Sequence, residues 1–243
     1  ASVTLAPTAP SVISLTGLAA NTRHYYRLCF KETSSNAVSL GPECSFQTAR
    51  AAASTFSFTL QADSHLDGNC SLDVYLKTLA NVAAEAPDFH IDLGDTFMCE
   101  KFSAPLTNVA QTSPDNATVV ARYQYERPHF GIIGASVPLF LTNGNHEGES
   151  SWMHTSEVGD DLAVWATLAR ERYYLNPTPD GFYQGDTSDT PFVGQRAAYY
   201  AWTWGSALFV VLDPYWNSVK PGSSGWNLTL GKAQYDWLSS TLA

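Results

Sequence analysis

From residue 53 to the end of the chain, short apolar runs alternate with longer segments that carry apolar residues at helical spacing. Apolar and polar residues alternate along 55–62, and 89–93 and 137–141 are short, mostly apolar runs. Patterns of these kinds predict β-strands. The stretches between the three strands are long enough to hold helical crossovers, which predicts an α/β domain.

The segments around these runs predict helices and a hairpin. Residues 72–86 and 161–174 place their apolar side chains on one face of a helix. Residues 198–204 and 207–212 are apolar and are separated by a Gly-Ser pair, which predicts an antiparallel hairpin. Residues 231–242 predict a final helix.

The first fifty residues have a different pattern. Residues 12–15, 25–30 and 44–47 predict short strands joined by turns that contain Gly, Pro, Asn and Ser. An Ala-rich stretch then leads into the α/β pattern, so we place a domain boundary there. Residues 1–52 are expected to form an all-β unit and residues 53–243 an α/β unit.

Charge and hydropathy narrow the possible partners. The 243-residue chain has a formal net charge of -10, and a nucleic-acid backbone requires a basic surface, so we expect no nucleic-acid partner. A phosphoester substrate is not excluded, because bound cations would reverse the local charge. No apolar run approaches the roughly 20 residues of a membrane-spanning helix, so we expect no membrane span.

Polar side chains follow all three predicted strands of the α/β unit. Asp63 and His65 come after the first strand, Asp95 after the second, and Asn145 and His146 after the third. In an open α/β sheet, ligands bind at the carboxyl ends of the strands. Each residue alone is explained as well by a turn or a helix cap. Their recurrence in order at one sheet edge favours a metal site, in which a carboxylate can bridge two cations.

These segments resemble the calcineurin-like metallophosphoesterases, whose ordered motifs are Asp-x-His, Gly-Asp and Gly-Asn-His-Asp/Glu. The resemblance implies that Asp63 and His65 ligate a first metal ion, that Asp95 bridges two ions, and that Asn145 ligates the second. Asp95 and His146 would be the catalytic residues, with His146 assisting the leaving group. The implied cofactors are two divalent metal ions, such as Mn, Zn or Fe.

The same resemblance implies the four-layer α/β/β/α sandwich of that family. The family's final motifs, a lone His and Gly-His-x-His, have no counterpart here, because no histidine follows His154. Residues 15–26 resemble the E–F corner of a fibronectin type III domain, and such a module precedes the catalytic domain of purple acid phosphatases. We therefore expect a partial fibronectin type III or Ig-like unit and an incomplete phosphoesterase domain, truncated at both ends.

Two positions depart from the purple acid phosphatase pattern. Those enzymes supply a tyrosinate to ferric iron where this chain has Met98, and they generally have glycine where this chain has His65. A thioether supplies no anionic oxygen, and an imidazole adds a neutral nitrogen. The resemblance therefore implies divalent ions rather than a ferric-tyrosinate centre.

The chain contains four cysteines, and an even number suits an oxidising compartment, so we expect a secreted or periplasmic protein. Cys29 and Cys44 flank a predicted hairpin and could bridge its strands. Cys70 and Cys99 follow the first and second metal-ligand motifs, so a shared metal ion would bring them close enough for a second disulfide. The alternative is four free, buried thiols.

Together these features predict metal-dependent hydrolysis of small phosphomonoesters, as in purple acid phosphatases. In the implied mechanism, a hydroxide activated by two metal ions attacks phosphorus. Two alternatives stay open. The same metal centre serves phosphodiesterases that act on cyclic nucleotides or phospholipids. A chain without the C-terminal histidines could also be a non-catalytic metal-binding or adhesion fragment.

Overall fold

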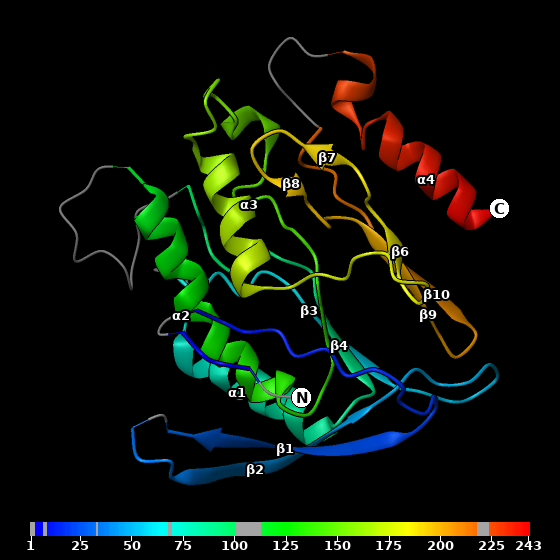
Figure 1. Ribbon diagram of the computed structural model, residues 1–243. Coiled ribbons are helices and arrows are strands. Elements are labelled where there is room, and N and C mark those ends of the chain that lie inside the picture. The colour runs from blue at the N-terminus through cyan, green and yellow to red at the C-terminus, as the bar shows by residue number, and fades with distance from the viewer. Residues whose placement is uncertain (1–2, 7–8, 33, 68–69, 101–112, 218–223) are drawn as a thin grey trace.

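A parallel sheet of three strands lies at the centre of the computed structural model (Figure 1). Its strands are β3 (Phe58–Gln61), β4 (Phe89–Asp92) and β5 (Leu139–Leu141), in the order β3-β4-β5. All three strands were predicted, and each is shorter than its apolar run. The structure describes residues 3–6, 9–32, 34–67, 70–100, 113–217 and 224–243.

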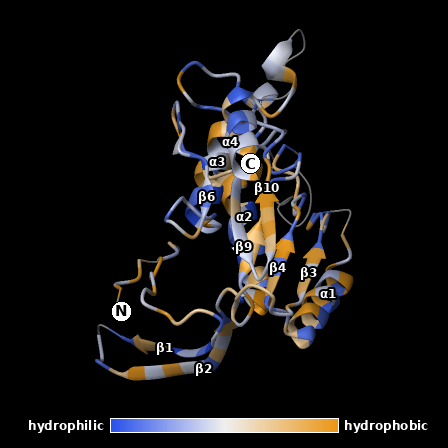
Figure 2. Cartoon of the chain, turned by 90° about the vertical axis from the view of Figure 1, so that its right-hand side faces the viewer, coloured by the Kyte–Doolittle hydropathy of each residue, from blue (hydrophilic) through white to orange (hydrophobic). Residues whose placement is uncertain are grey.

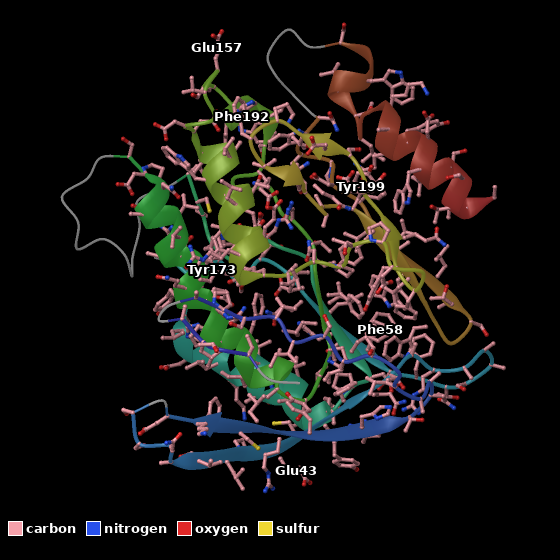
Figure 3. All side chains as sticks on the ribbon, viewed as in Figure 1. Glu43, Phe58, Glu157, Tyr173, Phe192 and Tyr199 are labelled. Atoms are coloured by element: carbon pink, nitrogen blue, oxygen red, sulfur yellow. The ribbon has the colours of Figure 1, made fainter. Side chains whose placement is uncertain are left out.

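The two faces of the central sheet carry different side chains. On β4, Phe89 and Ile91 point to a second sheet, whereas the buried polar residues His90 and Asp92 point to the opposite face. Phe58 of β3, which is labelled in Figure 3, stacks on Phe89. The two ring centroids are 5.3 Å apart. In Figure 2 both β3 and β4 carry hydrophobic residues along the strand, which alternate with polar ones.

The second sheet has the strand order β10-β9-β6 and is antiparallel. It contains β6 (Gln184–Gly185), β9 (Tyr200–Trp204) and β10 (Ala207–Val211), and β9 and β10 form the predicted hairpin. The indole ring of Trp202 stacks on Phe140 of β5 at 3.9 Å. Aromatic side chains therefore form much of the core between the two sheets.

Three helices cover the other face of the central sheet (Figure 1). They are α1 (Leu72–Glu85), α2 (Asn116–Gly134) and α3 (Leu162–Tyr173), and α2 packs between the other two. The predictions for α1 and α3 are confirmed. The final helix, α4 (Lys232–Leu242), was also predicted and lies on the side of the second sheet, where Trp237 contacts Tyr199 (Figure 1).

The remaining short elements lie in the connections after β5. They are β7 (Asp189–Thr190), β8 (Gly194–Gln195) and the 3₁₀ turns Ser151–Met153 and Gly225–Leu228. None of the described helices is both long enough and apolar enough to cross a membrane.

The N-terminal hairpin lies at one end of the molecule (Figures 1 and 2). It consists of β1 (Arg23–Lys31) and β2 (Val38–Gln47), which confirms two of the three strands predicted there. Residues 12–15 form no strand, because they pair with no other segment in the described part of the chain. The assignment of this region to a fibronectin type III or Ig-like domain, and the boundary after residue 52, stay predictions.

The four cysteines are free thiols, so neither predicted disulfide forms. The register of the hairpin excludes the first one, because Cys29 pairs with Leu40 whereas Cys44 pairs with Tyr26. Cys44 thus lies four residues along β2 from the position opposite Cys29, or roughly 13 Å. A disulfide requires a Cα separation of about 4.4–6.8 Å.

The second predicted disulfide fails because its two cysteines belong to different parts of the core. Cys99 is fully buried in the cluster formed with α2 and α3, whereas Cys70 packs against the cluster of α1 and α2. The side chain of Cys99 fills the space above Gly148, where an added Cβ would lie only 2.9 Å from it. Cys99 is therefore a packing residue of the core.

Candidate metal centre

The loops that follow β3 and β4 run side by side. The backbone N–H of Asp63 donates to the carbonyl oxygen of Gly94 at 3.0 Å, and the N–H of His65 donates to that of Asp95 at 3.0 Å. These hydrogen bonds continue the pairing of two parallel strands beyond their carboxyl ends. The polar residues that the sequence places after each strand therefore meet at one edge of the sheet.

Three of the predicted ligands converge at this edge. The side chains of Asp63, His65 and Asp95 each offer one ligand atom, and these atoms all lie within 4.8 Å of one another. His65 Nε2 is 3.6 Å from Asp63 Oδ1 and 4.0 Å from Asp95 Oδ2. The group opens to solvent on one side, since Asp63 is 67% exposed, whereas Asp95 is 13% exposed.

The donor set fits a divalent metal ion. Two atoms bound to one ion at about 2.0–2.2 Å lie at most roughly 4.4 Å apart, and both His65 distances satisfy this limit. Carboxylate oxygen and imidazole nitrogen are ligands for Zn, Mn and Fe(II). The other ring nitrogen of His65, Nδ1, is buried and faces Asp67 at 4.0 Å. A carboxylate behind a ligating histidine is the common arrangement in metal sites.

The backbone at these three residues adopts a left-handed conformation. The φ angles are 56° at Asp63, 42° at His65 and 54° at Asp95. Such angles are uncommon for residues other than glycine and cost of the order of 1 kcal/mol or more each. The hydrogen bonds between the two loops hold these conformations in place.

Close contact between the β4 and β5 loops requires glycine on both sides. A Cβ at Gly94 would lie 2.1 Å from the backbone nitrogen of Gly144, and a Cβ at Gly144 would lie 2.2 Å from Asp95 Oδ1. Neither contact is sterically possible. The glycines of the Gly-Asp and Gly-Asn-His motifs therefore allow the third loop to reach Asp95.

Glu147 joins the same two loops through its carboxylate. One oxygen accepts hydrogen bonds from the backbone N–H groups of Asp95 at 3.0 Å and Gly144 at 2.5 Å, and the other accepts from that of Thr96 at 2.9 Å. Burial raises the pKa of Glu147 to about 8, although the N–H groups of Thr96 and Asp95 oppose this rise. Glu147 therefore positions the loops beneath the metal ligands.

Asp92, at the end of β4, supports the turn that carries Asp95. It accepts hydrogen bonds from the N–H of Gly94 at 2.9 Å and from the side chain of Gln61 at 2.8 Å. Burial raises its pKa to about 7. Two residues earlier, burial lowers the pKa of His90 to about 4, so its imidazole is neutral near pH 7.

His146 lies beside the three ligands. Its backbone N–H donates to Asp95 Oδ1 at 2.8 Å, and its ring centroid is 5.4 Å from that of His65. Its Nδ1 makes a short hydrogen bond with Glu100 Oε1, which leaves Nε2 as its second ring nitrogen. Asn145, the residue before it, is exposed in the same loop.

The structure thus brings together Asp63, His65, Asp95 and His146, and places Asn145 in the adjoining loop. Among the described residues, Asp63, His65 and Asp95 are the one group of at least three His, Cys, Asp or Glu side chains close enough together to hold a metal ion. The ligand roles and the presence of a second ion stay predictions. Met98 is buried in the core.

Sequence analysis missed the positioning roles of Glu147 and Glu100. Glu147 stands as the fourth residue of the Gly-Asn-His-Asp/Glu pattern, so its place in that pattern was the available signal. Glu100 gives no sequence signal, because its contact with His146 joins residues 46 positions apart.

Of the comparisons with known proteins, the one with solved structures finds a similar fold. No family model and no curated protein matches the sequence. Two solved structures are similar to this chain. One is a purple acid phosphatase from yellow lupin (Lupinus luteus) seeds, with a TM-score of 0.51, 15% identity and coverage of 81% of this chain and 31% of that one. The other is PhoD, with a TM-score of 0.57, 20% identity and coverage of 93% and 46%.

At these identities the likeness concerns the fold alone. This chain spans less than half the length of either structure. The mixed α/β fold of the chain is similar to the folds of these two structures, and its candidate metal group lies at the loops that follow the central strands.

Proposed function

We propose that this chain forms the metal-binding part of a hydrolase that acts on phosphomonoesters. The observation that carries this proposal is the convergence of Asp63, His65 and Asp95 at the ends of two adjacent parallel strands, with His146 beside them. The likeness of the fold to that of a purple acid phosphatase and of PhoD supports it.

In this proposal Asp63, His65 and Asp95 hold a divalent ion, and Asn145 with Asp95 extends the site toward a second. Bound ions of this kind polarise phosphate oxygens and lower the pKa of water toward neutrality. The acidic side chains alone would repel a phosphoester. The site therefore requires bound cations before it accepts this substrate.

His146 supplies the proton that the departing alkoxide requires. Its Nδ1 is held by Glu100, so Nε2 is the atom that gives the proton. The hydrogen bond to Glu100 fixes the orientation of the imidazole ring. A positioned acid of this kind typically contributes about 10²–10⁴-fold to the rate.

Manganese binding and hydrolysis of p-nitrophenyl phosphate test the proposal. We expect Mn²⁺ to bind with micromolar or tighter affinity and to be required for turnover. Asp95→Ala should abolish both binding and turnover, because it removes a shared ligand. His146→Ala should keep the metal but slow turnover by about 10²-fold or more, because only the proton donor is lost.

Asp73→Asn is the matched control, since Asp73 is an exposed acid in the first turn of α1. It should leave metal affinity and turnover unchanged. Unchanged metal affinity in Asp95→Ala would refute the proposed site. Faster hydrolysis of bis-p-nitrophenyl phosphate than of the monoester would replace the monoesterase with a diesterase. Tight metal binding without turnover of either ester would favour a non-catalytic binding role.

A further inference from the structure

A small polar cavity lies between the central sheet and the helices α2 and α3. Its volume is about 10 Å³. One water molecule requires roughly 10–15 Å³, so the cavity has room for a single water molecule and for no larger ligand. Its lining includes Asp92 and Glu147, whose carboxylates accept hydrogen bonds from the backbone of the metal-centre loops. The cavity therefore borders the candidate metal centre, but none of the candidate metal ligands lines it.

Four of the lining side chains carry a buried polar atom that has no hydrogen-bond partner among the described residues. All four side chains belong to residues that are at most 7% exposed. The atoms are Tyr123 Oη of α2, Arg170 Nη1 of α3, Tyr174 Oη just after α3, and Asn143 Nδ2 of the β5 loop. Buried polar groups nearly always have a partner in folded proteins. Four such atoms around one cavity indicate that they share a partner inside it.

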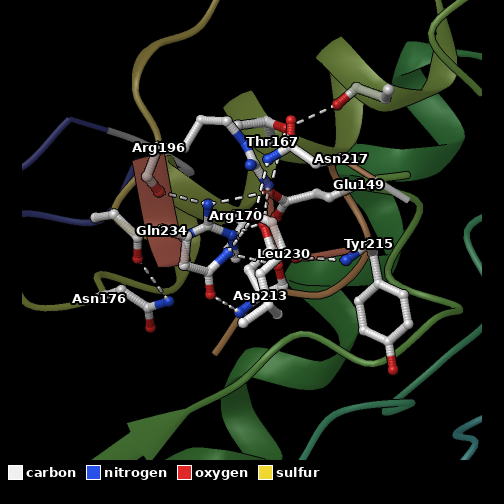
Figure 4. Close-up of polar contacts among 12 residues, drawn as sticks. Glu149, Thr167, Arg170, Asn176, Arg196, Asp213, Tyr215, Asn217, Leu230 and Gln234 are labelled. Atoms are coloured by element: carbon white, nitrogen blue, oxygen red, sulfur yellow. Dashed lines mark hydrogen bonds and ion pairs between the residues drawn. The ribbon is translucent and has the colours of Figure 1, made fainter. Parts of the chain in front are cut away.

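The guanidinium group of Arg170 is held by its other two nitrogens (Figure 4). Its Nε makes a short hydrogen bond with Glu149 Oε1. Its Nη2 donates to Glu149 Oε2 at 3.1 Å and to the carbonyl oxygen of Arg196 at 2.6 Å. Because the guanidinium is a rigid plane, these contacts also fix the direction of Nη1. This N–H donor therefore cannot turn toward another acceptor.

The hydrogen-bonding groups of the lining determine which ligand fits. Arg170 and Asn143 present N–H donors, so the ligand must accept hydrogen bonds, which a metal cation cannot do. An anion accepts them, but it would face the carboxylates of Asp92 and Glu147. A water molecule accepts two hydrogen bonds and donates two. The carboxylates and the tyrosine hydroxyls can accept the two that it donates.

We propose that this cavity is a binding site for one ordered water molecule, which accepts hydrogen bonds from Arg170 Nη1 and Asn143 Nδ2. Such a water molecule joins α3 to the β5 loop. Asn143 directly precedes Gly144, which lies against Asp95 where the two metal-centre loops cross. The bound water thus helps to hold the β5 loop at this crossing. The inference goes beyond the proposed function, because the water is bound whether or not a metal ion is present.

A crystal structure of the wild-type protein at about 1.5 Å resolution tests this site directly. We expect one peak of electron density at about 2.5–3.2 Å from both Arg170 Nη1 and Asn143 Nδ2, with and without Mn²⁺. Absence of this peak overturns the proposal. A peak that lies beyond hydrogen-bond distance of both nitrogen atoms also overturns it.

Substitution of the two tyrosines gives a second measurement, made by denaturant unfolding. If the hydroxyls bind the water, Tyr123→Phe and Tyr174→Phe should each raise the equilibrium constant for unfolding about 2–12-fold, as for loss of one hydrogen bond. Hydroxyls that are buried without any partner predict the opposite result, because their removal stabilises the fold. Greater stability of both variants than of the wild type would therefore overturn the proposal.

Tyr25→Phe is the control, because Tyr25 is an exposed tyrosine of the N-terminal hairpin. It should leave both the density peak and the unfolding equilibrium unchanged. The density is measured on the wild-type protein, so the proposal stays testable even if a variant fails to fold.

Discussion

Glu126 of α2 is a fully buried carboxyl group that forms no ion pair with any residue in the described part of the chain. Its Oε1 accepts a short hydrogen bond from the hydroxyl of Tyr75, and Oε2 has no partner in the described part of the chain. Burial raises the pKa of Glu126 to about 8, and the charges of Asp92 and Glu147 raise it further. The folded protein therefore binds this proton more tightly than the unfolded chain does.

A carboxyl group whose pKa is raised by folding makes the protein less stable as the pH rises. The unfolded carboxyl titrates near 4.5 and the folded one near 8, so stability from this group falls as pH rises from about 4.5 to about 8. We expect Glu126→Gln to match the wild type near pH 4.5 and to exceed its free energy of unfolding at pH 9 by at least about 1 kcal/mol. Thermal melts should show a gain of roughly 2–4 °C at pH 9.

The exposed Glu85 of α1 provides the comparison. Glu85→Gln should stay within about 0.5 kcal/mol of the wild type at both pH values, because surface substitutions rarely do more. A Glu126→Gln protein that is less stable than the wild type at pH 9 would show that this carboxylate is charged and stabilising in the fold.

Whether a residue of the site could be predicted depends on how far apart in the sequence its partners lie. Asp63, His65 and Asp95 were predicted because each follows a strand, and strand ends of a parallel sheet meet at one edge. Glu100 was not, because its hydrogen bond to His146 depends on how distant segments pack. The left-handed backbone conformation of the three candidate ligands was also not predicted, because an aspartate or histidine in a sequence does not by itself indicate a positive φ angle.

Between elements, the crossing of the β4 and β5 loops at Gly144 is the tightest contact of the site. Alanine at this position would place a Cβ 2.2 Å from Asp95 Oδ1. Relief of this clash requires Asp95 to move. We expect Gly144→Ala to lose metal affinity by at least tenfold and to lower the free energy of unfolding by about 1–3 kcal/mol, as overpacking does.

Gly131→Ala tests whether this effect is specific to the crossing. Gly131 lies within α2, and an added Cβ there meets nothing within 4 Å. Because alanine favours a helix over glycine by about 0.5–1 kcal/mol, this variant should be as stable as the wild type or more so. Its affinity for Mn²⁺ should not change. Wild-type metal affinity in Gly144→Ala would mean that the third loop can bind without touching Asp95.

Elements with a regular hydrophobic pattern were predicted, and those without it were not. The strands β3, β4 and β5 and the helices α1 and α3 have such patterns and were found. The helix α2 lacks a distinct apolar face and contains Pro128, so sequence indicated only a crossover of sufficient length. Tertiary packing between α1 and α3, together with the Asp115 cap, forms this helix instead.

For the molecule as a whole, two hydrogen bonds attach the N-terminal hairpin to the segment that follows α2. The hydroxyl of Tyr26 donates to the carbonyl oxygen of Ala135, just after α2, at 2.7 Å. The N–H of Ser45 donates to the hydroxyl of Ser136 at 3.4 Å. These two bonds join the all-β unit to the helical layer.

Removal of the first bond should loosen the hairpin without disturbing the metal centre. In Tyr26→Phe we expect amide hydrogen exchange across β1 and β2 to accelerate about fivefold, corresponding to roughly 1 kcal/mol for one hydrogen bond. Exchange in β3 and β4 and the affinity for Mn²⁺ should stay at wild-type values. Tyr25→Phe, one residue away but exposed, should leave exchange unaltered. Equal acceleration in both variants would contradict the proposed tether.

At this scale the sequence indicated an α/β fold, and the helices and two sheets confirm it, whereas the four-layer sandwich and the domain boundary after residue 52 stay predictions. The two predicted disulfides were wrong, because strand register and core packing decide which cysteine side chains meet. Neither register nor packing follows from spacing along the chain.

At Asp63, His65 and Asp95 the left-handed backbone makes thermal stability and metal binding conflicting demands. Glycine would relax all three positions, yet glycine carries no ligand atom. An engineering campaign that selected only for survival at high temperature would therefore accumulate glycine there. The resulting protein would be more stable, but it would lack the side chains that are proposed to bind the metal ion.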